Sequence, residues 1–229
     1  MNTVFFKNLG IINFKDAWEV QEKLLQSIIE QKRSKQPTKN YLLFCQHPHV
    51  YTLGKSGNKK NLLLSEFDLK KNNAEFYKIN RGGDITYHGP GQLVIYPVFD
   101  LDNFFTDIHK YLRFLEEVVI FVLSEFSLKG VRVSGKTGVW LNTPSGQQKI
   151  CAMGVRASRW VTMHGLAFNV SVDLSYFNNI IPCGIQNKGV TSLESVLNKS
   201  VDMVDVEDLF ISAFKSVFNI TLKNSYEAI

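Results

Sequence analysis

Cysteine is scarce in this sequence, and the few cysteines present form no recognisable framework. Cys45, Cys151 and Cys183 are the three in 229 residues, and an odd, low number argues against a disulfide scaffold. The ligand spacings typical of zinc sites, Cys-x-x-Cys and His-x-x-x-His, do not occur. We therefore expect an ordinary hydrophobic core and no metal site.

Long apolar segments are also missing. The longest apolar runs, such as Val118–Leu123, fall far short of the roughly 20 residues that a membrane-spanning helix needs. Met1–Gly10 is a mixed stretch with Lys7 in its middle, unlike a leader that is first basic and then apolar. These absences predict a cytoplasmic protein without membrane association, and a chain of this length fits one domain, residues 1–229.

Positive charge exceeds negative charge only mildly, since 26 Lys and Arg against 21 Asp and Glu give +5. Such a field favours encounter with an acidic partner, and both nucleic acid and acyl carrier protein are acidic. It is equally compatible with a surface that only keeps the protein soluble. There is no helix-turn-helix signature, and no basic cluster occurs beyond the lysine pairs Lys59–Lys60 and Lys70–Lys71. Nucleic acid is therefore not expected as a partner.

Hydrophobic periodicity predicts an α+β fold. Apolar residues at helical spacing predict helices over about 14–31, 107–126 and 205–218, with Asp205 as N-cap of the last, and a short helix from about Thr191. Short apolar runs predict strands at Tyr41–Cys45, Val50–Leu53, Phe76–Asn80, Leu93–Phe99, Gly138–Leu141, Lys149–Val155 and Gly165–Val172. Their spacing favours a central mixed sheet flanked by helices.

The densest group of polar residues lies in the stretch Arg81–Gln92. Five of its twelve residues are Gly or Pro, and Gly82 and Gly83 allow a ligand to approach the backbone closely. The stretch has neither P-loop nor G-x-G-x-x-G spacing, which counts against nucleotide hydrolysis there. A bare tight turn is the weaker interpretation, because hydrogen-bonding side chains crowd the same loop: Arg81, Asp84, Thr86, Tyr87 and His88.

Cys183 is the candidate nucleophile, although a lone cysteine is more commonly structural. Pro182 restrains the backbone before it and Gly184 frees the backbone after it, so the thiol sits on a turn where N–H donors can favour its thiolate. Cys45 and Cys151 lie in apolar strand runs, where a small buried side chain is the expected role.

Lys149 is the candidate acid/base, although a lysine that opens an apolar strand is commonly a solvated edge charge. In a partly dry pocket it loses its proton more readily and can serve Cys183 as a base. Cys151 lies two residues further, on the same expected strand face, which makes it a candidate second thiol of the pocket.

For His164 we expect a satisfied core histidine. No G-x-S-x-G motif converts His88 or His164 into part of a serine triad.

These residues and their neighbours resemble the octanoyltransferases of lipoate synthesis, also called lipoyl(octanoyl) transferases. The matching segments lie within about residues 41–195: Cys45–Gly54, Arg81–Leu93, Leu115–Val119, Thr137–Trp140, Lys149–Val155, Ser158–Val161, His164–Val170, Ile181–Ile185 and Val190–Leu193. The string Arg-Gly-Gly-x-x-Thr-Tyr-His-Gly-Pro-Gly together with Pro-Cys-Gly-Ile is highly specific. Departures are small: His49 stands where small or apolar residues are common, and Cys151 where alanine is frequent.

The resemblance implies the single-domain fold of biotin and lipoate protein ligases. It implies that the residue matching Cys183 takes the octanoyl group from octanoyl-acyl carrier protein as a thioester, while the one matching Lys149 lowers the thiol pKa. The acceptors would be lysines of lipoyl domains in 2-oxoacid dehydrogenases and of the glycine cleavage H protein. No cofactor and no ATP would be needed, and a monomer is the simplest expectation. The substrate slot would be lined by Arg81, Gly82, Gly83, Asp84, Ile85, Thr86, Tyr87, His88, Ala152, Met153, Gly154, Gly165, Leu166 and Ala167.

Three other functions are compatible with parts of the sequence. An ATP-dependent lipoate or biotin ligase would share the fold, but it has no need of the Cys183 and Lys149 pair. A non-catalytic lipoyl-domain or nucleic-acid binder would not need both candidate catalytic residues. A transferase that moves octanoyl between lipoyl domains would differ only in its donor, and the long match over Arg81–Leu93 argues against it.

Overall fold

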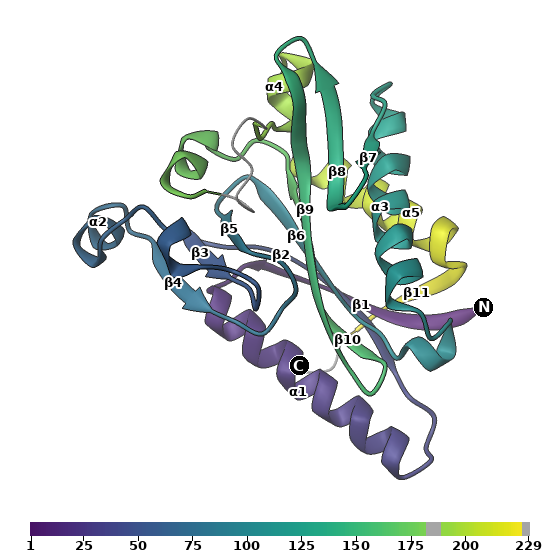
Figure 1. The fold of residues 1–229 in the computed structure, drawn as a ribbon. Helices are drawn as coiled ribbons and strands as arrows, with labels where there is room; N and C mark the ends of the chain where they lie inside the picture. The colour runs from purple at the N-terminus through teal and green to yellow at the C-terminus, as the bar shows by residue number, and fades with distance from the viewer. Residues whose placement is uncertain (182–188, 226–229) are drawn as a thin grey trace.

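Residues 1–181 and 189–225 are described in the structure, a computed structural model built around one large sheet (Figure 1). The sheet has eight strands in the order β11-β1-β2-β6-β10-β9-β8-β7. β1 pairs in parallel with β11 and β2, and the other neighbours are antiparallel. The strands are β1 Asn2–Ile11, β2 Asn40–Gln46, β6 Gln92–Val98, β7 Val131–Val133, β8 Lys136–Thr143, β9 Gly146–Ser158, β10 Val161–Asn169 and β11 Ile220–Asn224.

A smaller sheet forms a lobe beside the large one. Its order is β4-β3-β5, with β3 parallel to β4 and antiparallel to β5. The strands are β3 Val50–Leu53, β4 Glu75–Lys78 and β5 Ile85–His88. The short helix α2 (Glu66–Lys71) stands at the outer end of this lobe in Figure 1, and the 3-10 turns η1 (Lys59–Asn61) and η3 (Leu174–Asn179) complete it.

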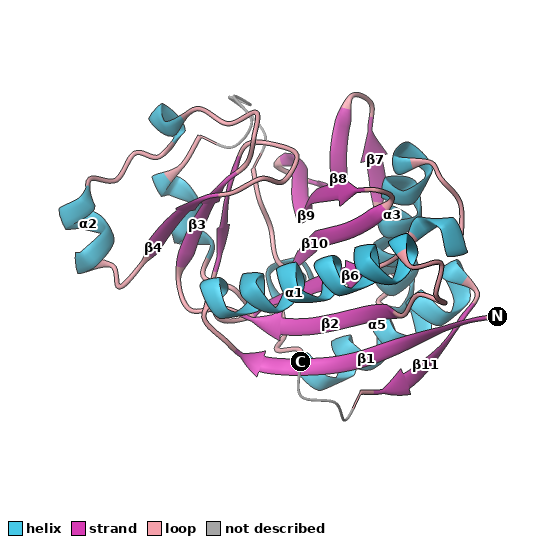
Figure 2. Cartoon of the chain, turned by 90° about the horizontal axis from the view of Figure 1, so that it is seen from below, coloured by secondary structure: helices cyan, strands magenta, loops and turns pink. Residues whose placement is uncertain are grey.

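Helices cover both faces of the large sheet. α1 (Phe14–Arg33) packs on one face against β6 and β10, and α3 (Ile108–Glu125) and α5 (Met203–Phe218) pack together on the other, as Figure 2 shows. Their apolar stripes are buried against the sheet: Leu25 and Ile28 of α1 and Leu115 of α3 are fully buried. The short elements α4 (Leu193–Leu197) and η2 (Leu101–Asn103) connect the strands and helices. In the described residues, no helix is long and apolar enough to cross a membrane.

The predicted α+β class and mixed sheet flanked by helices are confirmed. β1, β7 and β11 lie outside the predicted strands, and two further local corrections apply. The last helix begins at Met203, because Asp202 and not Asp205 caps it, its carboxylate accepting the Val204 N–H at 2.9 Å. The stretch Arg81–Gln92 is not loop throughout, since β5 lies inside it and pairs with β3.

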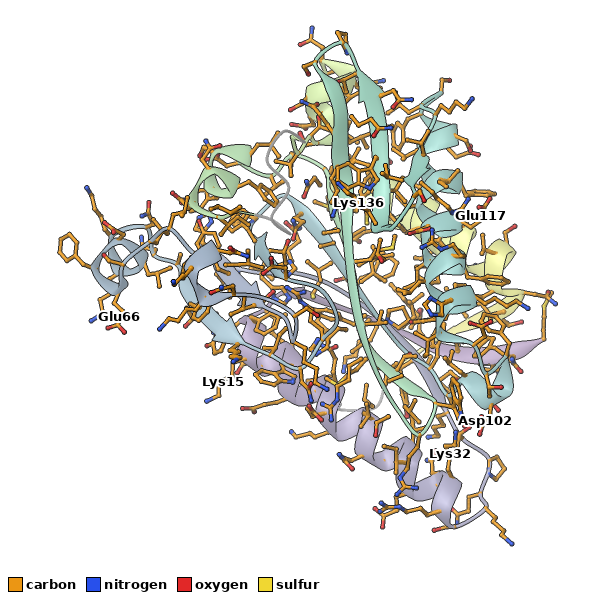
Figure 3. The ribbon with its side chains drawn as sticks, viewed as in Figure 1. Lys15, Lys32, Glu66, Asp102, Glu117 and Lys136 are labelled. Atoms are coloured by element: carbon orange, nitrogen blue, oxygen red, sulfur yellow. The ribbon has the colours of Figure 1, made fainter. Side chains whose placement is uncertain are left out.

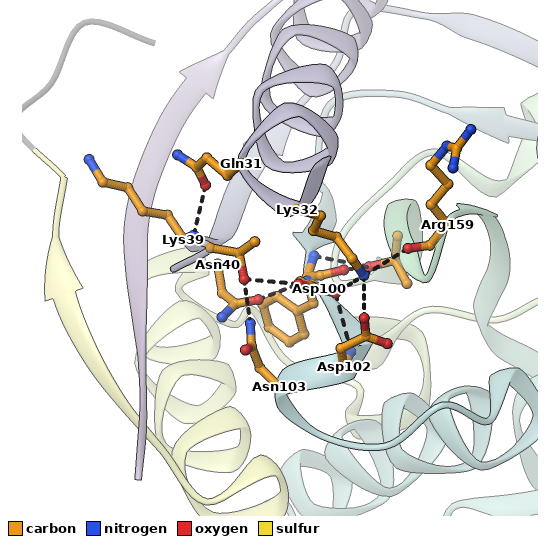
Figure 4. A network of polar contacts seen from close by, with 11 residues as sticks. Gln31, Lys32, Lys39, Asn40, Asp100, Asp102, Asn103 and Arg159 are labelled. Carbon is orange, nitrogen blue, oxygen red and sulfur yellow. Dashed lines mark hydrogen bonds and ion pairs between the residues drawn. The ribbon is translucent and has the colours of Figure 1, made fainter. Parts of the chain in front are cut away.

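A partly buried ion-pair network fixes the C-terminal end of α1 (Figure 4). The Lys32 ammonium lies 2.5 Å from an Asp100 carboxylate oxygen and 2.7 Å from one of Asp102, and it donates to the Arg159 carbonyl. Asp100 is 3% exposed and also accepts from the Thr38 hydroxyl. Burial works against the charge of Lys32, but the two carboxylates outweigh it and raise its pKa. The network therefore joins α1 to the segment after β6 and to the β9–β10 turn.

We expect Lys32→Ala to destabilise the fold by about 2–3 kcal/mol. The variant leaves Asp100 buried without its cation. The expected loss of stability is smaller than that for a fully buried ion pair, because Lys32 keeps some access to water. Urea unfolding of the wild type and variant measures it. Lys23→Ala, an exposed position on the same helix, is the control and should change stability by less than about 0.5 kcal/mol. Equal losses in both variants would contradict the role of the network.

Candidate functional site

A cavity of about 540 Å³ is lined by residues of both sheets. This volume lies within the range of small-molecule sites, about 300–1,000 Å³. A groove of similar volume, about 590 Å³, runs along the outer surface of α1 between Glu22 and Gln36, but it contains no predicted site residue. The cavity between the sheets is therefore the candidate site.

Most of the predicted substrate-binding residues line this cavity. They come from the loop before β5 and from three strands, and the set is Arg81, Gly82, Gly83, Asp84, Ile85, Thr86, His88, Ala152, Met153, Gly154, Gly165, Leu166 and Ala167. Lys149 lines it as well. Residues far apart in the sequence thus meet around one space, although their roles in binding stay predictions.

Tyr87 is the predicted substrate-binding residue that does not line the cavity. Side chains alternate along β5, so Tyr87 points to the opposite side from Thr86 and His88. Its ring stacks on Tyr176 and its hydroxyl lies 2.6 Å from His49 Nδ1. Burial raises the pKa of Tyr87 above its ordinary value. The contacts of Tyr87 are those of a residue that supports the small lobe.

Arg81 joins the small sheet to the large one. Its guanidinium donates to the Thr52 carbonyl at 2.7 Å and to the Thr52 hydroxyl at 2.9 Å, and the side chain is 7% exposed. The next residue, Gly82, donates its N–H to the Val155 carbonyl of β9 at 2.9 Å. A Cβ on Gly154 would lie 2.7 Å from the Gly82 carbonyl oxygen, so only glycine permits this approach.

Lys149, on β9, lines the cavity as well. Its ammonium nitrogen is 4.7 Å from the centroid of the Trp140 ring on β8, a distance at which a cation and an aromatic face attract. Its backbone N–H donates to the Gly189 carbonyl at 2.9 Å, and its carbonyl accepts the Thr191 N–H at 3.0 Å. The strand thus holds the chain that follows residue 188.

The expectation that Cys151 shares the face of Lys149 is wrong. Val139 pairs with Cys151 and Trp140 with Lys149, which leaves Ile150 as an extra residue on β9. Such a bulge breaks the two-residue alternation of a strand. Lys149 therefore faces the cavity while Cys151 is fully buried in the core, where burial raises its pKa. Cys151 is not a second thiol of the pocket.

Cys183, the predicted nucleophile, lies outside the described residues. The chain on either side of it is described. Ile181 donates its N–H to the Asn61 carbonyl at 2.9 Å, and Gly189 bonds to Lys149. Cys45 is 1% exposed and burial raises its pKa, as expected for a small buried side chain.

Three buried histidines surround the cavity, of which His88 and His164 line it directly. Burial lowers the pKa of His47 to about 4, and those of His88 and His164 to about 3, with the Arg81 charge adding to the effect on the last two. The rings are therefore neutral at pH 7. His164 differs from the satisfied histidine that was expected, because its Nε2 has no hydrogen-bond partner among the described residues.

Sequence reasoning missed the apolar part of the cavity wall. It is formed by Phe14, Ile79, Val94, Ile108, Leu112 and Phe177, from five separate segments of the chain. Each of them reads as an ordinary core residue, and no local motif distinguishes it. These side chains make the cavity suited to an apolar chain.

Gly130–Thr137 carries the spacing of a P-loop, G-x-x-x-x-G-K-T, so nucleotide binding must be weighed against the fold. A P-loop joins a strand to a helix whose N-terminus faces the phosphates. Here the stretch forms the β7–β8 hairpin, with Val131 paired to Trp140 and Val133 to Lys136. The match is therefore one of spacing alone. No group of His, Cys, Asp or Glu that could hold a metal ion occurs among the residues described.

Comparison with known proteins agrees with the resemblance seen in the sequence. Residues 13–215 match the family described as lipoyl protein ligase A/B catalytic domain. An octanoyltransferase of Christiangramia forsetii is 58% identical over 95% of this chain and 96% of its own length. One of Cytophaga hutchinsonii is 52% identical over 97% and 96%. The predicted family and the predicted acyltransferase class are confirmed.

Solved structures show the same fold at low sequence identity. A bipartite lipoate protein ligase of Thermoplasma acidophilum, studied with its E2 lipoyl domain, superposes with a TM-score of 0.72 at 19% identity, over 98% of this chain and 86% of that one. A biotin protein ligase of Aquifex aeolicus, bound to biotin and ATP, gives 0.54 at 12% identity, over 96% and 71%. The predicted biotin and lipoate ligase-like fold is confirmed.

We expect the protein to lose stability when the pH falls below about 6.5. An unfolded histidine has a pKa near 6.5, whereas His47, His88 and His164 have folded pKa values of about 4, 3 and 3. The unfolded chain therefore binds more protons between these values, and each histidine removes up to about 1.4 kcal/mol per pH unit.

Urea unfolding at about pH 7 and pH 5 tests this expectation. His88→Asn should reduce the loss of stability between the two values, because the variant has one fewer buried group to protonate. His109→Asn, at an exposed position, is the control and should leave the loss unchanged. A wild type that is equally stable at both values would show that the histidines can be protonated without unfolding.

Proposed function

This chain belongs to the lipoyl protein ligase A/B catalytic-domain family, and we propose that it transfers an octanoyl group from octanoyl-acyl carrier protein to lysines of lipoyl domains through a thioester on Cys183. The observation that carries the proposal is one cavity with apolar walls in which the Arg81–His88 segment and Lys149 meet. The high identity to octanoyltransferases supports it.

Two acyl transfers make up the reaction. In the first, Lys149 takes the thiol proton, the Cys183 sulfur attacks the thioester carbonyl, and the carrier thiolate leaves and takes that proton from Lys149, which becomes a neutral base again. In the second, the neutral amine of the acceptor lysine attacks the acyl-enzyme, loses a proton to the same base, and releases Cys183. The first step exchanges one thioester for another and the second forms an amide, so neither needs ATP.

Lys149 is well situated for this role because its side chain lines the cavity while its backbone bonds to Gly189, six residues after Cys183 in the sequence. Thioester attack creates an oxyanion, and backbone N–H groups near Cys183 would stabilise it. Trp140 against the ammonium gives Lys149 a defined position.

The apolar wall accounts for the acyl chain. An eight-carbon chain gains about 0.8 kcal/mol for each methylene that it buries, so the cavity can bind it without any polar contact along its length. Gly154 and Gly165 let neighbouring backbone pack closely behind this wall, since a Cβ on either would lie within 2.7 Å of a backbone oxygen. We assign the acyl chain to the part of the cavity lined by these apolar side chains.

The partners follow from the same proposal. The donor is the octanoyl-acyl carrier protein, and the acceptors are lipoyl domains of 2-oxoacid dehydrogenases and the glycine cleavage H protein. A monomer acting in the cytoplasm stays our prediction. An ATP-dependent ligase on this fold is less favoured, because the relatives with the highest identity quoted above are transferases.

Intact-mass analysis tests the covalent step. Wild type incubated with octanoyl-acyl carrier protein, without ATP, should gain one octanoyl group that hydroxylamine removes. Cys183→Ser should gain no such thioester, and Lys149→Ala should load at least about 100-fold more slowly, because it lacks the base. Adding a lipoyl domain should then discharge the wild-type adduct as an amide.

Cys151→Ser is the matched control, since it removes a thiol that is buried away from the cavity. It should load like the wild type. An adduct that persists in Cys183→Ser but disappears in Cys151→Ser would show that Cys183 is not the nucleophile. A wild type that loads only with ATP and free octanoate would replace the proposal with the ligase reaction.

A further inference from the structure

Glu116 is a fully buried carboxylate on α3 that does not line the cavity, so its burial needs another explanation. One of its oxygens, Oε2, lies 2.7 Å from the Arg113 guanidinium and 3.0 Å from that of Arg132. Both arginines are partly exposed, at 46% and 35% of the side chain, whereas Glu116 is at 0%. Burying a charge is costly, so its second oxygen needs an equally defined partner.

That second oxygen, Oε1, accepts the backbone N–H of Gly138 on β8 at 3.1 Å. Gly138 has φ +115°, a conformation that other residues rarely adopt. A Cβ there would lie 2.5 Å from the Cys151 carbonyl oxygen and 3.6 Å from Lys149 Cε. The carboxylate therefore holds a backbone segment that lies directly against the aliphatic stem of Lys149.

The same part of β8 carries the aromatic contact of Lys149. Trp140, two residues after Gly138, is the cross-strand partner of Lys149, and its ring lies 4.7 Å from the ammonium. The register changes between Val139 and Trp140, because Ile150 bulges from β9 opposite them. Gly138 thus lies beside the stem of Lys149 and Trp140 contacts its charged end, on either side of the register shift.

We propose that Glu116 is a positioning residue for Lys149. It fixes Gly138 and, through it, the irregular part of β8 whose Trp140 ring and glycine backbone hold the Lys149 side chain in the cavity. The inference rests on the proposed function, in which Lys149 is the acid/base. It also connects two family-matching segments, Leu115–Val119 and Thr137–Trp140, to the proposed base.

Glu117 provides a matched comparison on the same helix. It pairs with Arg132 as Glu116 does, but its side chain is 52% exposed, and in the described part of the chain the Gly138 N–H bonds to Glu116 and not to Glu117. Figure 3 labels Glu117 on α3, and Lys136 on the neighbouring β8. Removal of either carboxylate therefore disturbs Arg132. Only the removal of the Glu116 carboxylate also takes away the acceptor of the Gly138 N–H.

Octanoyl loading kinetics with Glu116→Gln and Glu117→Gln test the proposal. Glu116→Gln should lower kcat about tenfold or more while KM for octanoyl-acyl carrier protein stays within about twofold, because a misplaced base slows the chemical step but leaves the acyl slot intact. Glu117→Gln should change neither constant by more than about twofold. Glutamine is close in shape to glutamate, which preserves folding, and circular dichroism and urea unfolding verify this.

A second measurement reads the position of Lys149 without activity. The rate at which trinitrobenzenesulfonate modifies Lys149, followed by peptide mass spectrometry, should change at least threefold in Glu116→Gln and stay at the wild-type value in Glu117→Gln. A purely structural Glu116 would alter stability but leave this rate unchanged, and that result would overturn the proposal. Equal kcat losses in the two variants would overturn it as well.

The Lys149→Ala variant separates this inference from the proposed function. If Lys149→Ala transfers octanoyl at the wild-type rate, Lys149 is not the acid/base and both proposals fail. If Lys149→Ala is slow and Glu116→Gln is as fast as the wild type, the proposed function stands and the positioning role is refuted.

Discussion

The site depends on one junction, where the small sheet meets β9 of the large one. The Gly82 N–H bonds to the Val155 carbonyl, and the guanidinium of Arg81 reaches back to Thr52 of β3. The first bond fixes the loop on the large sheet, and the second ties the same loop to its own lobe. Because the cavity walls come from both sheets, this junction sets the width of the space between them. Gly154 makes it possible, since any side chain there would meet the Gly82 carbonyl.

A second constraint decides which side chains face that space. The bulge at Ile150 reverses the alternation of β9, so that Lys149 lines the cavity and Cys151 enters the core. Without it, residues two apart would share a face, and the cavity would contain both. A thiol whose pKa is raised by full burial contributes packing and no reactivity. One irregular residue thus distinguishes a catalytic candidate from a structural one.

The sequence predicts some of this well, for physical reasons that differ from residue to residue. α3 is predictable because its apolar residues follow the helical period over five turns, and Arg81–His88 because polar groups gather among glycines. The bulge is not predictable, since Ile150, Cys151 and Ala152 are all apolar and give no sign of which faces inward. Asp202 and Asp205 are equally good caps by type. β1 and β11 pair in parallel although almost the whole sequence separates them, and no local sequence pattern predicts such a pairing.

The chain that flanks Cys183 is held by both walls of the cavity, and Asp84 contributes to this arrangement. One of its carboxylate oxygens accepts the Asn61 side-chain amide at 2.6 Å, and Asn61 in turn accepts the Ile181 N–H through its backbone carbonyl. On the other side, Gly189 bonds to the backbone of Lys149. The loop that contains Asp84 is therefore hydrogen-bonded through Asn61 to the residue two before Cys183, and the proposed base is separately bonded to Gly189, which follows it. Asp84 needs no chemistry of its own to matter, because through Asn61 it orients the chain up to Ile181, which precedes the proposed nucleophile in the sequence.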